Sequence, residues 1–183
     1  MIQSVCLFGA SSDRMDSEYN EAARELGRLL AQEGWMLVFG GGQHGMMGET
    51  AKGVHEGGGH VLGIIPEKLD EPHVSYEASD EWIVTDSLRD RKALMEEKSD
   101  AYVILPGGYG TLEEIMETMT LKQLGYHSKP MVILNTRGFY DKLFELFDHM
   151  IAETCVKSEH LDLFRVVDTP KDAICALREY NID

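Results

Sequence analysis

The sequence predicts an α/β protein with a doubly wound, Rossmann-like parallel sheet and helices on both faces. Three observations support this fold class. Apolar runs of strand length alternate along the chain with segments whose apolar residues recur at helical spacing. The strand segments are continuously apolar, which is typical of strands covered on both faces. Glycine-rich turns follow several of these strands, where parallel sheets bind their ligands.

The first part of the chain supplies five predicted elements with clear boundaries. They are, in order, strand 4–8, helix 16–33, strand 36–39, helix 45–55 and strand 60–65. Gly34 ends the first helix, and Pro66 closes the third strand. Three consecutive glycines, 40–42, end the second strand. Residues 67–80 show no period and are rich in turn residues, so we expect a surface loop that borders a site.

The second part continues the alternation of strands and helices. The predicted elements are strand 81–85, helix 88–98, strand 102–105, a helix from Thr111, strand 131–134, helix 138–153, strand 164–167 and a helix to about Tyr180. Thr169 and Pro170 begin the last helix, because proline suits the first helical position. Strand ends in such a sheet converge on one edge, and so should the glycine-rich turns.

The stretch from Tyr102 to Glu117, YVILPGGYGTLEEIME, is predicted as a strand, a glycine turn and the start of a helix. Its glycines allow positive φ angles and let another group approach the backbone closely. The free N–H groups and the dipole of a helix N-terminus favour an anion. We therefore expect a phosphate at this turn, beside the carboxylates of Glu113 and Glu114.

Helix capping offers an alternative explanation for part of this stretch. Thr111 and Glu114 stand at the spacing of a capping box, with Thr111 as the N-cap residue. A cap accounts for these two residues but leaves the glycines before them unexplained. The local pattern therefore keeps a cap and a ligand site open as alternatives.

Length, charge and cysteine content restrict the class of protein. A chain of 183 residues suits a single nucleotide-binding domain, 1–183, with a sizeable core. Its formal net charge of −15 repels nucleic acid and anionic membranes, so neither is expected as a partner. Three dispersed cysteines predict no disulfide framework. Without a signal-like N-terminus or a membrane-spanning run, we expect a cytoplasmic protein.

Residues 40–45 match the pattern GxGxxG, and Glu67 follows at a distance suited to a ribose-binding acid. A dinucleotide-dependent oxidoreductase is one alternative, but a glycine-rich run matches this pattern easily. A nucleotide-lining loop or a plain turn is favoured, with His44 as a surface residue of that turn. The scattered histidines show no metal-ligand spacing, so we expect neither a metal nor a cofactor.

Arg89, Arg91 and Lys92 form the densest basic group of this acidic chain. A solvated helix face is the usual explanation for such charges. Their position one strand before the central glycine turn instead favours anion recognition.

These spaced motifs resemble the Lonely guy family, the cytokinin-activating phosphoribohydrolases. The family signature PGGxGTxxE is met from Pro106 to Glu114, and the expected Arg-Lys pair stands at Arg91 and Lys92. The resemblance covers most of the chain through three further segments, 8–12 (FGASS), 38–48 (VFGGGQHGMMG) and 61–66 (VLGIIP). The largest departure is the segment 70–87, which lacks the Met-His pair that often precedes Arg-Lys.

The resemblance implies hydrolysis of the N-glycosidic bond of a purine nucleoside 5′-monophosphate, with a cytokinin or adenosine base. The products are the free base and ribose 5-phosphate. Glu114 would stabilise the cationic transition state and direct water, and Arg91 would stabilise developing charge. The substrate-binding residues would be Ser12, Gly42, Lys92, Gly107, Gly108, Gly110, Thr111, Glu113 and Thr120.

The resemblance also implies a homodimer, with residues of both chains near the site. A non-catalytic nucleotide-binding, sensing or carrier protein is the competing interpretation, because the same phosphate turn would serve it. Relatives have also been labelled lysine decarboxylases, but the sequence shows no pyridoxal-phosphate site.

Overall fold

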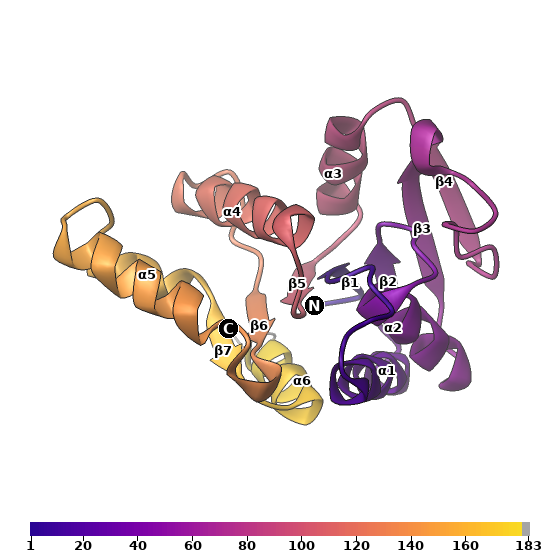
Figure 1. The fold of residues 1–183 in the computed structure, drawn as a ribbon, viewed down its shortest axis with the longest axis horizontal. Coiled ribbons are helices and arrows are strands. Elements are labelled where there is room, and N and C mark those ends of the chain that lie inside the picture. The colour runs from indigo at the N-terminus through magenta and orange to yellow at the C-terminus, as the bar shows by residue number, and fades with distance from the viewer. Residues whose placement is uncertain (181–183) are drawn as a thin grey trace.

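A computed structural model of the chain describes residues 1–180 and is built around one seven-stranded sheet (Figure 1). The strands are β1 Ser4–Phe8, β2 Met36–Phe39, β3 Val61–Pro66, β4 Glu81–Thr85, β5 Ala101–Ile104, β6 Met131–Leu134 and β7 Arg165–Val167. Their order is β4-β3-β2-β1-β5-β6-β7, and every neighbouring pair is parallel. The predicted parallel α/β fold is confirmed.

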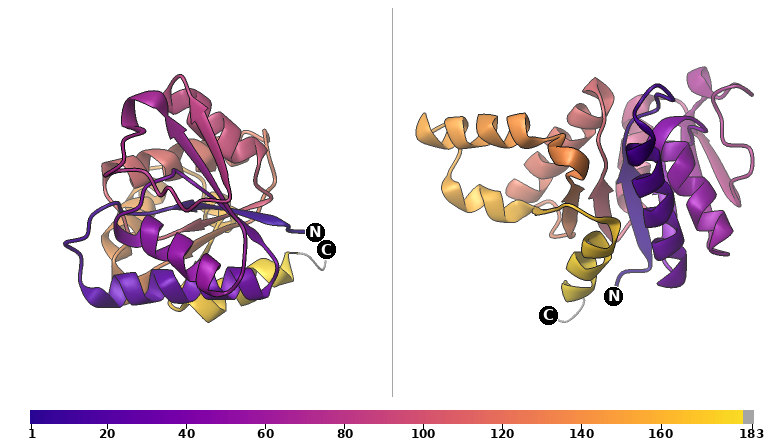
Figure 2. Two further views of the ribbon diagram at one scale, coloured as in Figure 1. Left: turned by 90° about the vertical axis from the view of Figure 1, so that its right-hand side faces the viewer. Right: turned by 60° about the horizontal axis from the view of Figure 1, so that its bottom comes forward.

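Helices cover both faces of the sheet and make three layers (Figures 1 and 2). The α-helices are α1 Ser17–Gln32, α2 Gly45–Glu56, α3 Leu88–Glu97, α4 Tyr109–Gln123, α5 Asp141–Ala152 and α6 Pro170–Glu179. Three short 3₁₀-helices join them, η1 Glu67–Leu69, η2 Thr136–Gly138 and η3 Ser158–Leu163. Within residues 1–180, no helix is both long enough and apolar enough to cross a bilayer.

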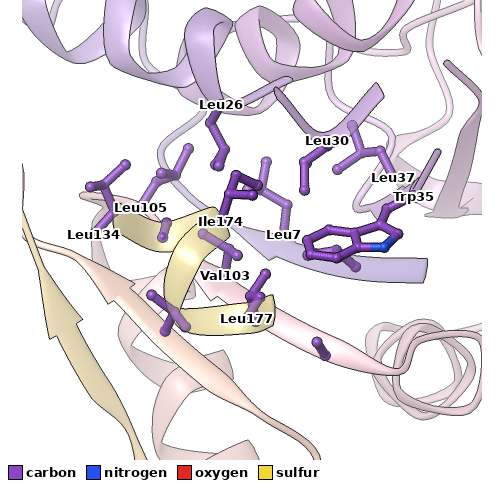
Figure 3. Close-up of a cluster of buried hydrophobic side chains, with 14 of the residues drawn as sticks. Leu7, Leu26, Leu30, Trp35, Leu37, Val103, Leu105, Leu134, Ile174 and Leu177 are labelled. Carbon is purple, nitrogen blue, oxygen red and sulfur yellow. The ribbon is translucent and has the colours of Figure 1, made fainter. Parts of the chain in front are cut away.

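The core lies in two layers, one on each side of the sheet. On one side, side chains of β1, β5 and β6 pack against α1, α2 and α6. Figure 3 shows the strand and helix residues of this layer that meet, among them Leu7, Val103, Leu134, Leu26, Leu30, Ile174 and Leu177. The other layer packs α3, α4 and α5 against the opposite face through Met95, Ile115 and Phe147. Burial on both faces explains why the strands are continuously apolar.

The strand order reverses between β1 and β5. From β1 the chain builds outward through β2, β3 and β4, and it then crosses back to place β5 on the other side of β1. Such a reversal leaves a crevice beyond the carboxyl ends of the two central strands. Residues 9–12 after β1 and 106–108 after β5 flank this crevice, and 40–44 after β2 lie beside it.

The central helix begins two residues earlier than the sequence predicted. Its N-cap is Gly108, no side chain caps it, and Thr111 lies inside its first turn. The capping-box alternative was therefore wrong, because Thr111 is not the N-cap residue and the carboxylate of Glu114 is bonded to Arg91 instead.

The predicted helix 138–153 also starts later, at Asp141. Arg137 and Gly138 have φ angles of 58° and 69°, which an α-helix cannot contain. The side-chain oxygen of Asn135 accepts a hydrogen bond from the backbone N–H of Tyr140 at 2.7 Å and sets the new start. The sequence reasoning missed all three 3₁₀-helices, and most other ends agree within one or two residues.

Candidate active site

A cavity of about 650 Å³ lies at the reversal of strand order. Three segments line it at the carboxyl ends of strands: the β1–α1 loop (9–16), the β2–α2 turn (40–45) and the β5–α4 turn (106–110). The predicted convergence of the glycine-rich turns is confirmed. The loop 67–80 borders the same cavity through Leu69 and Val74, as expected.

The β5–α4 turn presents the N-terminus of α4 to the cavity. The first helical bond joins the N–H of Leu112 to the oxygen of Gly108 at 2.9 Å. Within residues 1–180, the N–H groups of Tyr109, Gly110 and Thr111 have no hydrogen-bond partner. Such groups, together with the helix dipole, form a site for an anion.

Gly108, Gly110 and Thr111 line the cavity, and their substrate-binding role remains a prediction, whereas Gly107 shapes the turn from outside it. A Cβ atom at Gly107 would lie 2.1 Å from Oγ1 of Thr111. Glycine at this position therefore gives the Thr111 side chain its room. Its predicted substrate-binding role remains a prediction.

Arg91 from α3 and Glu114 from α4 meet at the inner wall of the cavity. Nη2 of Arg91 donates to Oε1 of Glu114, and only 14% and 10% of the two side chains is exposed. Burial raises the pKa of Glu114 to about 7, and the Arg91 charge opposes this shift. The pair therefore holds a carboxyl group that can accept or release a proton near neutral pH.

Glycine at position 40 is needed because the guanidinium group occupies the space beside it. A Cβ atom at Gly40 would lie 3.0 Å from Nη1 of Arg91. Nε of Arg91 is buried without a partner among the described residues. Because Gly40 has no side chain, the guanidinium group of Arg91 can pack against the β2–α2 turn.

The N-terminus of α2 also points toward the cavity, but residues of the β1–α1 loop occupy it. The N–H of Gly45 donates to Oδ1 of Asp13 at 2.7 Å, and the N–H of Met47 donates to the oxygen of Ala10 at 3.3 Å. The bond from Gly45 is the main reason why the pKa of Asp13 lies below its usual value. The carboxylate of Asp13 therefore acts as the anion at the N-terminus of α2.

His44 is an exposed residue of the turn, as expected, and it also lines the cavity. Its Nδ1 lies 2.6 Å from Oδ2 of Asp13, and its Nε2 lies 2.8 Å from the oxygen of His73. Gly42 and Ser12 line the cavity, and their substrate-binding role remains a prediction, while Glu67 does not line it. Since Asp13 fills the helix end that a dinucleotide would need, the GxGxxG match does not form a pyrophosphate site.

Three other predicted substrate-binding residues lie outside this cavity. Lys92 forms ion pairs with Glu113 and Glu117 on the far side of α4. Thr120 lies two turns further along, where its hydroxyl donates to the oxygen of Met116 at 2.6 Å. Substrate binding by Lys92, Glu113 and Thr120 remains a prediction. Within one chain, none of the three residues lines the cavity.

Sequence reasoning missed the apolar wall of the cavity. Its members come from the end of β3, from the loop 67–80, from α3 and from α2: Ile65, Leu69, Val74, Leu88 and Met47. The only signal for this wall was the position of the loop after a strand end. Backbone hydrogen bonds from Gln43 to Val74 and from Tyr76 to Gly41, both 2.8 Å, hold the loop against the β2–α2 turn.

Comparison with known proteins gives one family and consistent relatives. Residues 47–177 match the family described as "Possible lysine decarboxylase". A protein of Oryza sativa subsp. japonica named "Probable cytokinin riboside 5'-monophosphate phosphoribohydrolase" is 43% identical over 96% of this chain and 78% of its own length. An Arabidopsis thaliana protein named "Cytokinin riboside 5'-monophosphate phosphoribohydrolase" is 39% identical over 96% of this chain and 82% of its own length.

Among solved structures, the molybdenum cofactor carrier protein of Chlamydomonas reinhardtii is similar in fold. It superimposes with a TM-score of 0.76 at 26% sequence identity, and all of both chains is covered. The relatives that share about 40% of their sequence with this chain carry the name of a hydrolase, and this structural neighbour carries the name of a carrier.

Proposed function

The chain belongs to the Lonely guy family, and on this premise we propose that it is a phosphoribohydrolase that cleaves the N-glycosidic bond of a purine nucleoside 5′-monophosphate. The products are the free base and ribose 5-phosphate. The reaction needs a grip on the phosphate, a carboxylate near the anomeric carbon and a way to stabilise charge as the base departs.

One arrangement carries the proposal, namely the Arg91–Glu114 pair beside the open N-terminus of α4. The N–H groups of Tyr109, Gly110 and Thr111 suit the 5′-phosphate, because they are unpaired and lie at the positive end of the helix dipole. Glu114 follows Thr111 by less than one helical turn. A phosphate held at the turn thus places its ribose next to a buried carboxyl group.

The chemistry requires one bond to break and one to form at the anomeric carbon. The bond to the base nitrogen breaks through an oxocarbenium-like state, and a water oxygen bonds to the same carbon. The Glu114 carboxylate stabilises the cation and takes one proton from the attacking water, while the departing base nitrogen takes one proton from solvent. Glu114 then returns its proton to solvent, which balances the reaction. Arg91 stabilises the negative charge that develops during departure and keeps Glu114 oriented.

The apolar wall of the cavity supports a base with an apolar substituent, as in a cytokinin nucleotide. Contact between Ile65, Leu69 and Val74 and a hydrocarbon substituent would remove apolar surface from water, which stabilises binding. These three side chains offer no hydrogen-bond partner to the amino group of adenine. We expect kcat/KM for N6-isopentenyl AMP to exceed that for AMP. Equal values would assign the wall no role in base choice.

Base release from purified protein tests the activity directly. AMP and its isopentenyl derivative are incubated with the protein, and free base is separated by chromatography. Glu114→Gln and Arg91→Ala should each lower kcat about a hundredfold or more. Glu97→Gln, at the exposed end of α3, is the matched control and should retain wild-type turnover. Full activity in Glu114→Gln would refute the catalytic assignment.

A non-catalytic carrier is the second candidate, because the similar Chlamydomonas reinhardtii structure is titled a molybdenum cofactor carrier protein. The buried carboxyl group beside an arginine favours the enzyme, since a carrier has no use for a proton acceptor at this position. Nucleotide binding without base release would favour the carrier. Decarboxylation is not supported, because no lysine among the described residues lines the cavity to hold pyridoxal phosphate as a Schiff base.

The family resemblance further supports a homodimer in the cytoplasm. An apolar groove of about 220 Å³ between α4, α5 and η3, lined by Met116, Met119 and Phe147 among others, suits a protein partner. All three cysteines are free thiols, which fits a reducing compartment. Sedimentation equilibrium would test the dimer, and a concentration-independent monomer mass would contradict it.

A further inference from the structure

The backbone that leads into the β5–α4 turn is held from two flanks. On one flank, the N–H of Ala10 in the β1–α1 loop donates to the oxygen of Pro106 at 3.0 Å. On the other flank, the hydroxyl of Tyr140 donates to the oxygen of Leu105 at 2.8 Å. Leu105 and Pro106 are buried and immediately precede the glycines of the turn. The position of the turn therefore depends on contacts from two distant parts of the chain.

Tyr140 makes a polar contact from inside an apolar layer. Only 2% of the residue is exposed, and it belongs to the core layer between the sheet and α5. Phe139 and Phe144 pack against its ring, with centroid distances of 4.9 and 6.4 Å. A buried hydroxyl group needs a hydrogen-bond partner, and the oxygen of Leu105 is the one that it has. Packing and the hydrogen bond together fix the phenol in one place.

The connection between β6 and α5 holds the backbone of Tyr140 in place. Oδ1 of Asn135 accepts a hydrogen bond from the N–H of Tyr140 at 2.7 Å, and Nδ2 of Asn135 donates to Oδ1 of Asp141 at 2.8 Å. Gly138 has a φ angle of 69°, and a Cβ atom there would lie 2.5 Å from Oδ2 of Asp141. The bend that brings the phenol to the end of β5 is thus built from a glycine and two side-chain hydrogen bonds.

The phenol of Tyr140 acts on the turn itself as well as on the residue before it. Burial raises the pKa of Tyr140, the backbone N–H of Gly107 opposes this rise, and the charge of Glu114 adds to it. The phenol therefore lies near the first glycine of the turn and near the candidate catalytic carboxyl group. Tyr140 does not line the substrate cavity, so it can affect a bound phosphate only through the backbone of the turn.

We propose that Tyr140 is a positioning residue for the anion site. Its hydroxyl fixes Leu105 and the turn that follows, so that the N–H groups of Tyr109, Gly110 and Thr111 keep the arrangement that suits a phosphate. A turn rich in glycine has many conformations open to it, and a ligand that must first order such a turn binds more weakly. The inference rests on the proposed function, since it takes the group bound at this turn to be the 5′-phosphate of the substrate.

Binding of ribose 5-phosphate to Tyr140→Phe tests the proposal without requiring turnover. The variant loses the hydroxyl and keeps the ring, and circular dichroism establishes that it is folded at the temperature of the titration. By isothermal titration calorimetry, we expect the Kd for ribose 5-phosphate to rise about tenfold, which corresponds to about 1.4 kcal/mol and to one buried hydrogen bond. In turnover, the KM for AMP should rise by a similar factor, while kcat stays within about threefold.

Tyr102→Phe is the matched control, because it removes a buried phenol hydroxyl from the same core layer, and that hydroxyl has no hydrogen-bond partner among the described residues. It should leave the Kd unchanged.

Asn135→Ala removes the bond to the N–H of Tyr140 and should weaken binding in the same direction, whether or not Tyr140→Phe folds. An unchanged Kd in the variants of Tyr140 and Asn135 that fold, or an equal loss in Tyr102→Phe, would overturn the proposal. The expected rise in Kd without any base release by the wild type would instead refute the proposed function and leave the positioning role standing.

Discussion

The β2–α2 and β5–α4 turns look alike in sequence and differ in what fills them. Both are glycine-rich, both follow a central strand, and both lead into a helix without a side-chain cap from its own N-cap residue. At the β2–α2 turn, the carboxylate of Asp13 accepts a hydrogen bond from the N–H of Gly45, and the oxygen of Ala10 accepts one from the N–H of Met47. At the second, the N–H groups of Tyr109, Gly110 and Thr111 remain unpaired within residues 1–180.

The difference shows that a glycine-rich helix start is an anion site only when the protein leaves it open. The helix dipole acts at the N-terminus of α2 and at that of α4, but the carboxylate of Asp13 neutralises the first of them. The Arg91–Glu114 pair touches both turns, with Arg91 packed against Gly40 of the filled turn and Glu114 on the helix that follows the open one. Four predictions test this contrast, and the largest expected effect comes first.

Gly110→Ala should damage the β5–α4 turn as a binding site without damaging the fold. No protein atom lies within 4 Å of the added Cβ position, and alanine favours helices over glycine by up to about 1 kcal/mol. The methyl group would crowd the space beside the unpaired N–H groups. We expect kcat/KM to fall about a hundredfold while the melting temperature stays the same or rises. Unchanged kcat/KM would place the phosphate elsewhere.

Gly45→Ala should do the opposite at the β2–α2 turn. Gly45 has a φ angle of 60°, and a Cβ atom there would lie 2.6 Å from the oxygen of Ala10 and from the nitrogen of Ser12. We expect a loss of about 2 to 3 kcal/mol in the free energy of unfolding, measured by denaturant titration. A variant as stable as the wild type would show that this turn tolerates a side chain.

Glu114→Gln should change how stability depends on pH, because the buried acid lies on the helix that follows the open turn. Burial raises the pKa of Glu114 from 4.5 to about 7. The native state therefore keeps a proton that the unfolded chain releases. The stability contribution of the protonated group is complete below about pH 4.5 and is lost as the pH rises through about 7.

Between these limits, the wild type should lose on the order of 3 kcal/mol relative to Glu114→Gln, measured by urea unfolding at several pH values. Glu97→Gln is the control and should track the wild type throughout. A constant difference in the free energy of unfolding between the wild type and Glu114→Gln across this pH range would mean that burial does not raise the pKa of Glu114.

Asp13→Ala should convert the β2–α2 turn toward an open helix end. Loss of the bond from Gly45 should cost about 1 kcal/mol in the free energy of unfolding. Inorganic phosphate should then raise the melting temperature of the variant more than that of the wild type, because a second N-terminus accepts an anion. Asp13→Asn keeps an acceptor and should fall between the two. Equal phosphate responses would show that Asp13 does not block this site.

Much of the fold could be predicted from the sequence because the signals are local. Apolar runs such as 4–8 and 131–134 identified strands to the residue, and apolar spacing identified the helices between them. The alternation of both implied a parallel sheet, and a parallel sheet brings its strand ends to one edge. The Arg91 and Glu114 pair was also within reach, since the two residues flank one strand of the central unit.

The remainder depended on contacts between distant parts of the chain. Asp13 and Gly45 are 32 residues apart in the chain. The sequence around Gly45 does not predict that the Asp13 carboxylate accepts a hydrogen bond at the N-terminus of α2. Lys92 stands next to Arg91, yet the helix turns its ammonium group toward Glu113 and Glu117 and away from the cavity. The apolar wall combines Leu69 and Val74 of the aperiodic loop with residues of three regular elements, β3, α3 and α2.

The amino-acid sequence by itself determined the layers, the strands and the glycine turn before the central helix, because periodicity and backbone freedom are properties of neighbouring residues. Tertiary structure alone decided which of two similar helix ends stays open and which acid is buried deeply enough to titrate near neutral pH. Hydrogen-bond occupancy and desolvation depend on what packs against a group, and the packing partners of Gly45 and Glu114 lie on other elements of the fold.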